Sequence, residues 1–381
     1  METMQNLSRK SERNSLNKAE RICLFGLGVL FKDCYRQLTL SVGREPDLLC
    51  DNATEKWGKM FYGKKCISPR ELGEFGADTA VVITTRKYEE IYRQLREMGL
   101  NEIFVACFDR GYDIVANFKR LGRERRKSEQ ELYEYPVKGK WTLITGASRG
   151  IGRQIALGMA KLGSNIIAHS RQIAHTKDLV DTCAALGVQA VPVAAELSNL
   201  GEIEEMIDNL EHLFPPIDIL FNNAAISLPC GSDPWGISSE DYLTQYTVNT
   251  VAPIRICYGV IPAMIRRGFG RVVNISSTIQ RRVGEMGYAC SKAALSKFVH
   301  DLAPSLQGTG VMMSLVCPGY VRSDMGGVTA PHAVESVNPG VLLGALLDGD
   351  INGRWFIAQD YAGLSLSAAM KRAKFYYGQE D

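Results

Sequence analysis

The stretch Thr145-Gly146-Ala147-Ser148-Arg149-Gly150-Ile151-Gly152 decides the fold, because it follows the apolar run WTLIT at 141–145 and precedes a helical pattern. Glycines where a strand meets a helix let the backbone turn tightly and approach a pyrophosphate. The first N–H groups of the helix then face that anion. Turns also use glycine for conformational reasons alone, so the motif predicts a dinucleotide site only with support from the rest of the chain.

Strand-like runs and helical patterns alternate through the rest of this larger unit. Further strands are predicted at 165–168, 189–193, 217–221, 271–275 and 312–316. A helix is predicted after the polar pair Ser198-Asn199, where apolar residues recur at helical spacing from Ile203 to Leu213. Alternating elements imply a parallel sheet covered by helices. We therefore expect a doubly wound, Rossmann-type α/β domain over 139–381.

A smaller Rossmann-like α/β unit is predicted before it, over 21–118, behind a flexible tail at 1–20. A strand at 21–25 runs into Gly26-Leu27-Gly28, although Phe31 stands where a third glycine would be. Further strands are expected at 47–50, 80–84 and 102–107, and a helix at 88–98. The charged stretch 119–138 is interpreted as a solvated linker, because its acidic and basic residues are interleaved.

Composition sets limits on function. The 381 residues are enough for two domains, and a formal net charge of +2 gives no reason to expect nucleic acid or an anionic membrane as a partner. The polar N-terminus lacks the apolar core of a secretory signal, and no apolar run approaches the roughly 20 residues that span a bilayer. A cytoplasmic location is therefore expected.

Cysteine and histidine usage points away from metal chemistry. The ten cysteines form no C-x-x-C pair, and the five histidines are scattered along the chain. Buried, reduced thiols explain the cysteines better than a disulfide framework, and no metal site is expected.

Tyr288 and Lys292 are four residues apart on a helical segment, so they share one face. A neighbouring ammonium favours the phenolate of a tyrosine, whose ordinary pKa is about 10. The pair therefore suits proton transfer. A lone Tyr-x-x-x-Lys is common by chance, however, and in isolation a surface pair is the better interpretation.

Six motifs in order change that interpretation. They are the glycine turn at 145–152, Asn222-Asn223-Ala224-Ala225, Asn249 in YTVNTVAP, Asn274-Ile275-Ser276-Ser277, Tyr288 with Lys292, and Pro318-Gly319. From about Gly139 to about Ala358 the chain resembles the short-chain dehydrogenase/reductase family in its short form. The resemblance implies an NAD(P)(H)-dependent oxidoreductase acting on CH–OH or carbonyl groups.

The resemblance also implies a role for each matching residue. Tyr288 would exchange the proton with the substrate oxygen, Lys292 would tune Tyr288 and hold the nicotinamide ribose, and Ser277 would hydrogen-bond the substrate oxygen. Asn249 would hold a water in a proton relay behind Lys292, and Asn222 would brace the central strands. Besides Tyr288 and Lys292, the implied cofactor contacts are Gly146, Ser148, Arg149, Gly150, Ile151, Gly152, Arg171, Glu196, Leu197, Asn223, Ala224, Pro318, Gly319, Val321 and Ser323.

Some positions depart from the family pattern. The gap from Ser277 to Tyr288 is two residues shorter than in many members, which leaves Ser276 as a rival for the catalytic serine. Glu196-Leu197 stands where the family usually has an aspartate before an apolar residue, so an adenine contact would have a different geometry. Ala225 replaces a glycine.

The cofactor choice rests on the end of the second strand of this unit, Ala168-His169-Ser170-Arg171, which carries no acidic residue. A carboxylate there would hold the ribose hydroxyls of NAD and repel a 2′-phosphate. Arg149 and Arg171 instead offer guanidinium groups suited to a phosphate. NADPH is therefore expected, with NADH as the alternative if both arginines are solvated surface charges.

These features predict an NADPH-dependent carbonyl reductase acting on a small-molecule ketone or aldehyde. An NAD-dependent alcohol dehydrogenase is one alternative. A non-catalytic binding or scaffold protein is another, although the intact set of Asn249, Ser277, Tyr288 and Lys292 argues against it. The resemblance further implies a homo-oligomer, with apolar Leu295, Phe298 and Val299 as candidate contacts or as ordinary core. The short segment 323–340 predicts an open or adaptable substrate site, with 226–239 as another wall.

The N-terminal unit carries Cys50-Asp51-Asn52, Lys56-Trp57-Gly58-Lys59 and Ile67-Ser68-Pro69. These stretches resemble nucleotide-fold domains attached to bacterial surface-polysaccharide and sugar-modifying enzymes. The resemblance implies a nucleotide or nucleotide-sugar at the strand ends, and hence a sugar or nucleotide-linked intermediate of carbohydrate biosynthesis as the substrate. A degenerate domain used for assembly or positioning remains the alternative.

Overall fold

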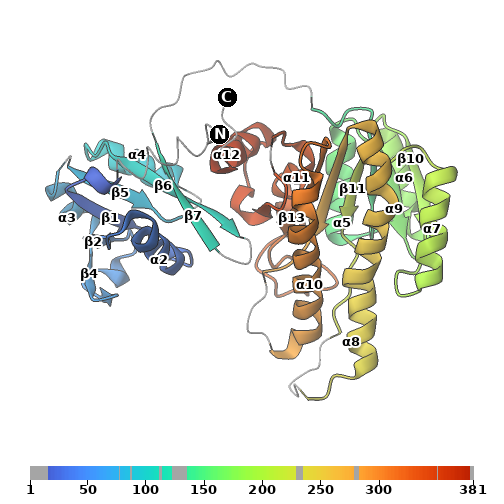
Figure 1. Cartoon of the computed structure of the whole chain (residues 1–381), viewed down its shortest axis with the longest axis horizontal. Coiled ribbons are helices and arrows are strands. Elements are labelled where there is room, and N and C mark those ends of the chain that lie inside the picture. Colours follow the sequence, from blue (N-terminus) through green and yellow to red (C-terminus); the bar gives the residue numbers. More distant parts are fainter. Residues whose placement is uncertain are drawn as a thin grey trace. The chain divides into compact units, whose positions relative to one another are not determined.

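The computed structural model describes residues 16–76, 78–85, 88–110, 114–121, 135–228, 235–278, 283–349 and 351–377. The chain divides into two compact units, Met1–Glu131 and Leu132–Asp381. Each is built from a sheet and helices, as the sequence predicts, and Figure 1 labels several elements of each.

The N-terminal unit contains a sheet with the strand order β3-β4-β2-β1-β5-β6-β7. These strands are β1 (Arg21–Phe25), β2 (Leu48–Cys50), β3 (Met60–Phe61), β4 (Lys64–Ile67), β5 (Thr79–Ile83), β6 (Ile103–Arg110) and β7 (Ile114–Arg120). The helices that accompany them are α2 (Phe31–Val42), α3 (Pro69–Glu74) and α4 (Glu89–Glu97). Phe31, the residue in place of a third glycine, is 4% exposed in the core between α2 and the sheet.

The four strands predicted in this unit are present, and the structure adds strands at both edges of the sheet. The central pairs β1–β2 and β1–β5 are parallel, but β3–β4 and β6–β7 are antiparallel. The expectation of a purely parallel sheet is therefore wrong at the edges. Edge strands are partly solvated and need no continuous apolar run, and Met60 in β3 is 63% exposed.

The predicted linker and tail both overlap folded parts of the chain. Arg120 ends β7 in the first unit, and Val137 is fully buried in the core of the second. The stretch 119–138 is therefore not wholly linker, and residues 122–134 lie outside the described residues. In the predicted tail, Leu16 is fully buried in the core of the first unit, whereas residues 1–15 are not described.

The C-terminal unit carries a parallel sheet with the order β10-β9-β8-β11-β12-β13-β14 over its described part. These strands are β8 (Trp141–Ile144), β9 (Asn165–Ser170), β10 (Ala190–Ala194), β11 (Ile219–Asn222), β12 (Gly270–Ile275), β13 (Val311–Cys317) and β14 (Trp355–Ile357). All six predicted strands are confirmed, and β14 is an addition at the edge.

Helices cover both faces of this sheet (Figure 1). One face packs against α5 (Gly150–Lys161), α6 (Lys177–Ala185), α11 (Leu343–Leu346) and α12 (Leu366–Tyr377). The other packs against α7 (Leu200–His212), α9 (Ala252–Arg267) and α10 (Met286–Leu302). The predicted helix after Ser198-Asn199 is α7, and the Asn199 side chain caps it by accepting from the Gly201 N–H at 3.0 Å. The doubly wound fold is confirmed.

The order of the strands locates the ligand-binding edge of this sheet. From β8 the chain adds β9 and β10 on one side, and then β11 to β14 on the other. Open α/β sheets bind ligands at the carboxyl ends of the strands where this reversal occurs. The glycine turn leaves β8 at that point, beside the end of β11.

One helical segment, Ser239–Arg267, is long and apolar enough to cross a membrane by length and composition, the one such segment in the described chain. It joins α8 (Ser239–Tyr246), a π-helical turn (Thr247–Val251) and α9. Ile256, Cys257 and Met264 of α9 are fully buried against the sheet. That packing is the behaviour of a core helix, so length and composition are weak evidence for a membrane span.

The cysteines are free thiols in the parts of the chain that the structure describes. Eight of them are buried, as expected, and Cys290 is exposed. Cys230 lies outside the described residues. Within those residues no three His, Cys, Asp or Glu side chains gather as a metal site would require.

Candidate active site

The glycine turn is fastened to the neighbouring strand β11. Thr145 follows β8, and its Oγ1 accepts hydrogen bonds from the backbone N–H groups of Asn223 (2.9 Å) and Ala224 (3.0 Å). Nδ2 of Asn223 donates in return to the carbonyls of Thr145 (2.9 Å) and Gly146 (3.2 Å). The amide of Asn223 therefore shapes the cofactor turn through the protein itself.

Gly152 shows why this turn requires glycine. A Cβ at this position would lie 2.1 Å from the carbonyl oxygen of Gly146 and 2.6 Å from Nδ2 of Asn223, closer than real Cβ contacts allow. Gly146 has a φ of 66°, in the left-handed region that favours glycine. The two glycines thus allow α5 to pack directly on the turn, as a dinucleotide site requires.

His169 holds the same turn from β9, and the sequence analysis did not assign it a role. The Gly146 N–H donates to Nδ1 of His169 (3.2 Å), and Nε2 hydrogen-bonds the carbonyl of Ala195 (3.1 Å). This pattern requires a neutral ring with its proton on Nε2. Burial lowers the pKa of His169 to about 4, despite opposing effects from Ala195 and Glu196. The sequence feature that could have indicated this role is the position of His169 near the end of the strand, where an acidic residue would hold the ribose of NAD.

The N-terminal end of α5 is suited to bind an anion. The helix begins at Gly150, so the N–H groups of its first turn have no partner within the helix. Those groups and the helix dipole favour a phosphate beside Ser148, Gly150 and Ile151. Arg149 precedes the helix with a side chain 67% exposed, and Arg171 after β9 is also exposed. The residues at the turn therefore fit the pyrophosphate part of a dinucleotide.

Glu196 and Leu197 follow β10 and are turned toward the protein. Oε1 of Glu196 accepts from the Ser198 N–H at 3.1 Å, while the Glu196 N–H donates to Oε2 of Glu202 at 2.7 Å. Leu197 is 4% exposed in the core. The Glu196 carboxylate thus supports its own loop in this structure, and its contact with adenine stays a prediction.

Tyr288 and Ser277 meet at the carboxyl end of β12. Tyr288 lies in the first turn of α10, Ser277 follows β12 by two residues, and their side chains are hydrogen-bonded. Burial raises the pKa of Tyr288 to about 12, Cys317 and Glu285 add to the rise, and the Ser277 hydrogen bond partly offsets it. With this pKa the phenol is in its protonated form at neutral pH.

Lys292 lies one turn further along α10 and is almost completely buried. Its Nζ donates to the Ile275 carbonyl at 2.8 Å, and burial lowers its pKa to about 7. Burial opposes the charged form of both Lys292 and Tyr288. The tuning of Tyr288 by a Lys292 ammonium stays a prediction.

The side chains of the two candidate serines, Ser276 and Ser277, point in different directions. Ser276 is 1% exposed, and its hydroxyl hydrogen-bonds Oγ of Ser296 (2.8 Å) and the Lys292 carbonyl (3.3 Å). Ser276 thereby fixes α10 against β12, whereas Ser277 contacts the phenol of Tyr288. Neighbouring residues of an extended chain point to opposite sides, so Ser277 is the serine that faces the Tyr288 phenol.

Asn249 lies in the π-helical turn Thr247–Val251, a helix irregularity that is often found at functional sites. Its Nδ2 donates to the Ile226 carbonyl (2.8 Å) and to Oγ of Ser291 (3.0 Å), and its Oδ1 accepts from the Ile226 N–H (2.8 Å). Ser291 in turn donates to the Tyr288 carbonyl at 2.8 Å. The side chain thus fixes the helix that carries Tyr288, and its role in a water relay stays a prediction.

Asn222 braces the central strands. It ends β11, and its Nδ2 donates to Oδ1 of Asn274 in β12 at 2.9 Å. Both side chains are essentially buried. The ends of β11 and β12 are therefore tied together beside the glycine turn and the Ser277–Tyr288 pair.

The loop after Pro318-Gly319 is closed at its base. Val321 pairs with His332, and the guanidinium of Arg322 donates to the carbonyls of Ala330 (3.0 Å) and Pro331 (3.2 Å). This loop, residues 321–332, is thus fastened at both ends. The open or adaptable substrate site expected from segment 323–340 stays a prediction. In the other predicted wall, residues 229–234 lie outside the described residues.

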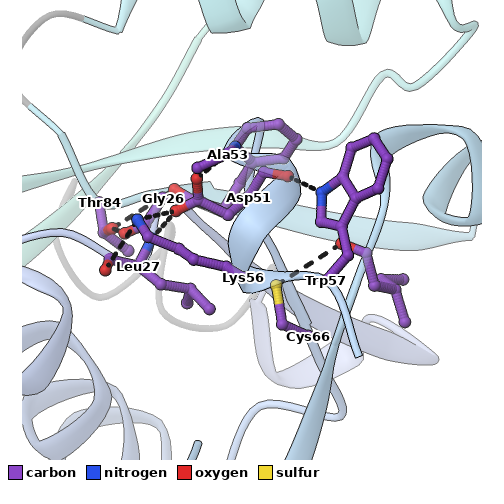
Figure 2. A network of polar contacts seen from close by, with 10 residues as sticks. Gly26, Leu27, Asp51, Ala53, Lys56, Trp57, Cys66 and Thr84 are labelled. Carbon is purple, nitrogen blue, oxygen red and sulfur yellow. Dashed lines mark hydrogen bonds and ion pairs between the residues drawn. The ribbon is translucent and has the colours of Figure 1, made fainter. Parts of the chain in front are cut away.

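The N-terminal unit uses its strand-end acid to close its own turn (Figure 2). Oδ2 of Asp51 accepts from the Leu27 N–H (2.5 Å) and Nζ of Lys56 (2.9 Å), and Oδ1 accepts from the Ala53 N–H (2.8 Å). Burial opposes the carboxylate, but these hydrogen bonds bring the pKa of Asp51 below its ordinary value. Trp57 completes the network by donating from Nε1 to the Asp51 carbonyl at 2.8 Å.

Comparison with known proteins identifies the family. Residues 140–333, just over half of the chain, match the family described as short chain dehydrogenase. The chain belongs to this family, whose members are NAD(P)(H)-dependent oxidoreductases. Residues 18–105 match a family described as C2185-like, N-terminal. That description names no ligand or reaction.

Individual relatives cover the same part of the chain. A short chain dehydrogenase from Pseudocercospora fijiensis is 34% identical over 51% of this chain, which spans 64% of that relative. A 3-oxoacyl-(acyl-carrier-protein) reductase from Aquifex aeolicus is 31% identical over 55% of this chain and 86% of its own length. A solved structure from Beutenbergia cavernae, described as an NAD(P)-dependent gluconate 5-dehydrogenase with bound NADP, is 26% identical. It covers 59% of this chain and 97% of its own, with a TM-score of 0.53.

Proposed function

We propose that this protein is an NADPH-dependent carbonyl reductase that converts a ketone or aldehyde to an alcohol in the cytoplasm. The observation that carries the proposal is the hydrogen bond between Ser277 and a protonated Tyr288, one helical turn before the buried Lys292. A reductase needs a proton donor at the oxygen of its substrate, and a tyrosine with a pKa of about 12 is in the donor form at neutral pH.

Each side chain has a defined task in this reaction. A bound nicotinamide supplies the hydride. The Ser277 hydroxyl and the Tyr288 phenol donate hydrogen bonds to the substrate carbonyl oxygen, where negative charge develops. Tyr288 then gives up its proton to that oxygen. Lys292 holds the ribose and supports the phenolate that remains, provided that contact with the cofactor restores its ammonium form.

The preference for NADPH follows from charges around the turn. Arg149 and Arg171 are exposed near the end of β9, and the buried residue at that strand end is a neutral histidine rather than an acid. A guanidinium binds a 2′-phosphate well, and a carboxylate would repel it. The Beutenbergia cavernae protein, whose structure is described with bound NADP, has a related fold.

A nucleotide-linked sugar or another intermediate of carbohydrate biosynthesis is the proposed substrate, and the N-terminal unit would orient it. The Asp51 carboxylate there is already held by Leu27, Ala53 and Lys56. Recognition would instead use backbone groups at the strand ends and the indole of Trp57, which is 41% exposed and offers a stacking face for a base.

A homo-oligomer is part of the proposal. Of the three candidate contact residues named from the sequence, however, not all are available to contact a partner subunit. Leu295 and Val299 are fully buried core residues, whereas Phe298 packs edge-on against Tyr258 of α9 with ring centroids 5.8 Å apart. Exposed Val251 (37%), Tyr258 (52%) and Ile265 (40%) recur every seven residues along this helical segment. An apolar stripe of this kind favours a partner helix.

The test compares two adjacent serines in the full chain. Purified wild type, Ser277→Ala, Ser276→Ala and Tyr288→Phe would be assayed for NADPH and NADH consumption with a panel of ketones, aldehydes and nucleotide-linked keto sugars. We expect turnover with NADPH preferred, loss of about 10²- to 10⁴-fold in the Tyr288 variant, and a large loss for Ser277 but not for Ser276. Equal losses at both serines, or an active Tyr288→Phe enzyme, would contradict the proposal.

The role of the N-terminal unit has its own control. Trp57→Ala should raise the KM for a nucleotide-linked substrate and leave the kcat for a small ketone unchanged. A KM that stays constant for every nucleotide-linked substrate would limit this unit to assembly or positioning.

A further inference from the structure

The guanidinium that is proposed to bind the 2′-phosphate already has an anionic partner. Nε of Arg149 lies 2.9 Å from Oδ2 of Asp324, which belongs to the loop 321–332 after Pro318-Gly319. The Arg149 and Asp324 side chains are 67% and 71% exposed. Because both lie in solvent, the pair can open without disturbing the core.

A second contact places this part of the loop beside the phosphate end of α5. A Cβ on Gly150, the first residue of the helix, would lie 3.7 Å from Cβ of Ser323. Ser323 also organises the residues after it, because its Oγ accepts from the Gly326 N–H (3.1 Å) and its carbonyl from the Gly327 N–H (2.8 Å). Asp324 is thus carried on a compact turn next to the helix N-terminus.

A carboxylate and a phosphate make similar demands on this site. Both bind a guanidinium through charge-assisted hydrogen bonds, and both are favoured near the N-terminus of a helix. Arg149 has one guanidinium, so an aspartate and a phosphate compete for the same N–H donors. Their negative charges also repel each other when both lie beside it. The same loop is fastened at its base by Arg322, which keeps Asp324 within reach.

We propose that Asp324 is a specificity-determining residue that competes with the 2′-phosphate of the cofactor for Arg149. The inference rests on the proposed function, in which Arg149 binds that phosphate. NADPH must displace Asp324 and thereby releases one attachment of the loop, whereas NADH leaves the ion pair in place. The preference for NADPH is consequently smaller than Arg149 alone would give.

The effect should be modest because an exposed ion pair contributes little. Removing the competitor is expected to tighten binding of a 2′-phosphate by about two- to five-fold. Ligands without this phosphate should bind with unchanged affinity, since they do not compete for the guanidinium.

The experiment uses titration calorimetry on the full chain with 2′,5′-ADP and with 5′-AMP, which differ by the phosphate in question. The variants are Asp324→Asn, Asp324→Ala, Arg149→Gln and the double variant Asp324→Ala/Arg149→Gln. The alanine is included because asparagine can still accept a hydrogen bond from Arg149. Asp178→Asn is the matched control. Asp178 is also exposed, and it pairs at 2.6 Å with Arg153 of α5, the helix that follows Arg149. Its neutralisation therefore changes the net charge equally.

Support requires that both Asp324 variants bind 2′,5′-ADP more tightly than wild type and than Asp178→Asn, with 5′-AMP unaffected and no gain in the Arg149→Gln background. If Arg149→Gln weakens 2′,5′-ADP but the Asp324 variants match Asp178→Asn, the competition is refuted while the NADPH assignment stands. If Arg149→Gln has no effect on 2′,5′-ADP, both the competition and the role of Arg149 in cofactor choice are refuted.

Discussion

The burial of the Lys292 amine has a measurable consequence for the stability of the protein. Burial lowers its pKa from 10.5 to about 7. Between these values the folded protein holds a mostly neutral amine, whereas the unfolded chain holds an ammonium. Because the unfolded state binds more protons over this window, Lys292 makes the free energy of unfolding rise as the pH increases from about 7 to about 10.5.

The magnitude follows from the size of the window. Each pKa unit corresponds to about 1.4 kcal/mol, so the burial of Lys292 costs on the order of 5 kcal/mol at or below neutral pH and nothing above the ordinary pKa. Lys292→Met removes this cost, but it also deprives the Ile275 carbonyl of a donor that lies at 2.8 Å. Losing that hydrogen bond costs about 1–3 kcal/mol at every pH. The variant should therefore be more stable than wild type by about 2–4 kcal/mol at pH 7, and the sign should reverse between about pH 8 and about pH 10.

Urea unfolding of the full chain from about pH 7 to about pH 10 would measure this reversal. A Trp57→Phe background confines the tryptophan signal to the C-terminal unit, because Trp141, Trp235 and Trp355 all lie there. Lys297→Met is the control, since Lys297 lies on the same helix with a side chain 50% exposed. A stability difference between Lys292→Met and its parent that does not change with pH would refute the reasoning.

Three further changes test the site and its assembly. Gly152→Ala should abolish cofactor binding, because its Cβ would lie 2.1 Å from the Gly146 oxygen, whereas Gly28→Ala meets nothing within 4 Å and should be neutral in calorimetry. His169→Asn should weaken cofactor binding and remove a fall in stability between pH 6.5 and about 4. That fall is expected because the folded pKa of His169 lies below its unfolded value, and a pH profile identical to wild type would exclude it. Tyr258→Glu should convert the oligomer to monomers in light scattering, and a monomeric wild type would reject the oligomer itself.

The sequence predicted the site well where the chemistry is carried by motifs close together in the chain. The glycine turn lies at the switch point of the sheet, and Asn222 braces β11 and β12 as expected. Tyr288 and Lys292 share one face of α10, as their four-residue spacing on a predicted helical segment requires. In these cases the residue types and their order determine the geometry with little help from the rest of the fold.

Other features depend on contacts between distant residues and were beyond reach of the sequence. Ser276 and Ser277 are adjacent, and only the position of α10 shows which one meets Tyr288. The partner of His169 is Gly146, 23 residues earlier, so its role required the pairing of β8 with β9. The direction in which the pKa of Tyr288 is shifted depends on its burial, and the spacing of residues in the sequence does not reveal burial.

The two units place a turn at the same point of a similar sheet but treat the N–H groups of that turn differently. In the N-terminal unit the Leu27 N–H is taken by the Asp51 carboxylate, which Lys56 neutralises. An anion near that turn would meet a carboxylate whose oxygens already accept several hydrogen bonds. In the C-terminal unit the Gly146 N–H is taken by the neutral His169, so the turn is fixed without adding negative charge. A phosphate approaching α5 therefore meets the N–H groups of the first helical turn and no acid at the strand end, and at Arg149 it has the exposed Asp324 to displace. Of the two turns, the one at Gly146 has charges that favour the phosphates of a dinucleotide. The cofactor is therefore assigned to the C-terminal unit, which also holds Tyr288.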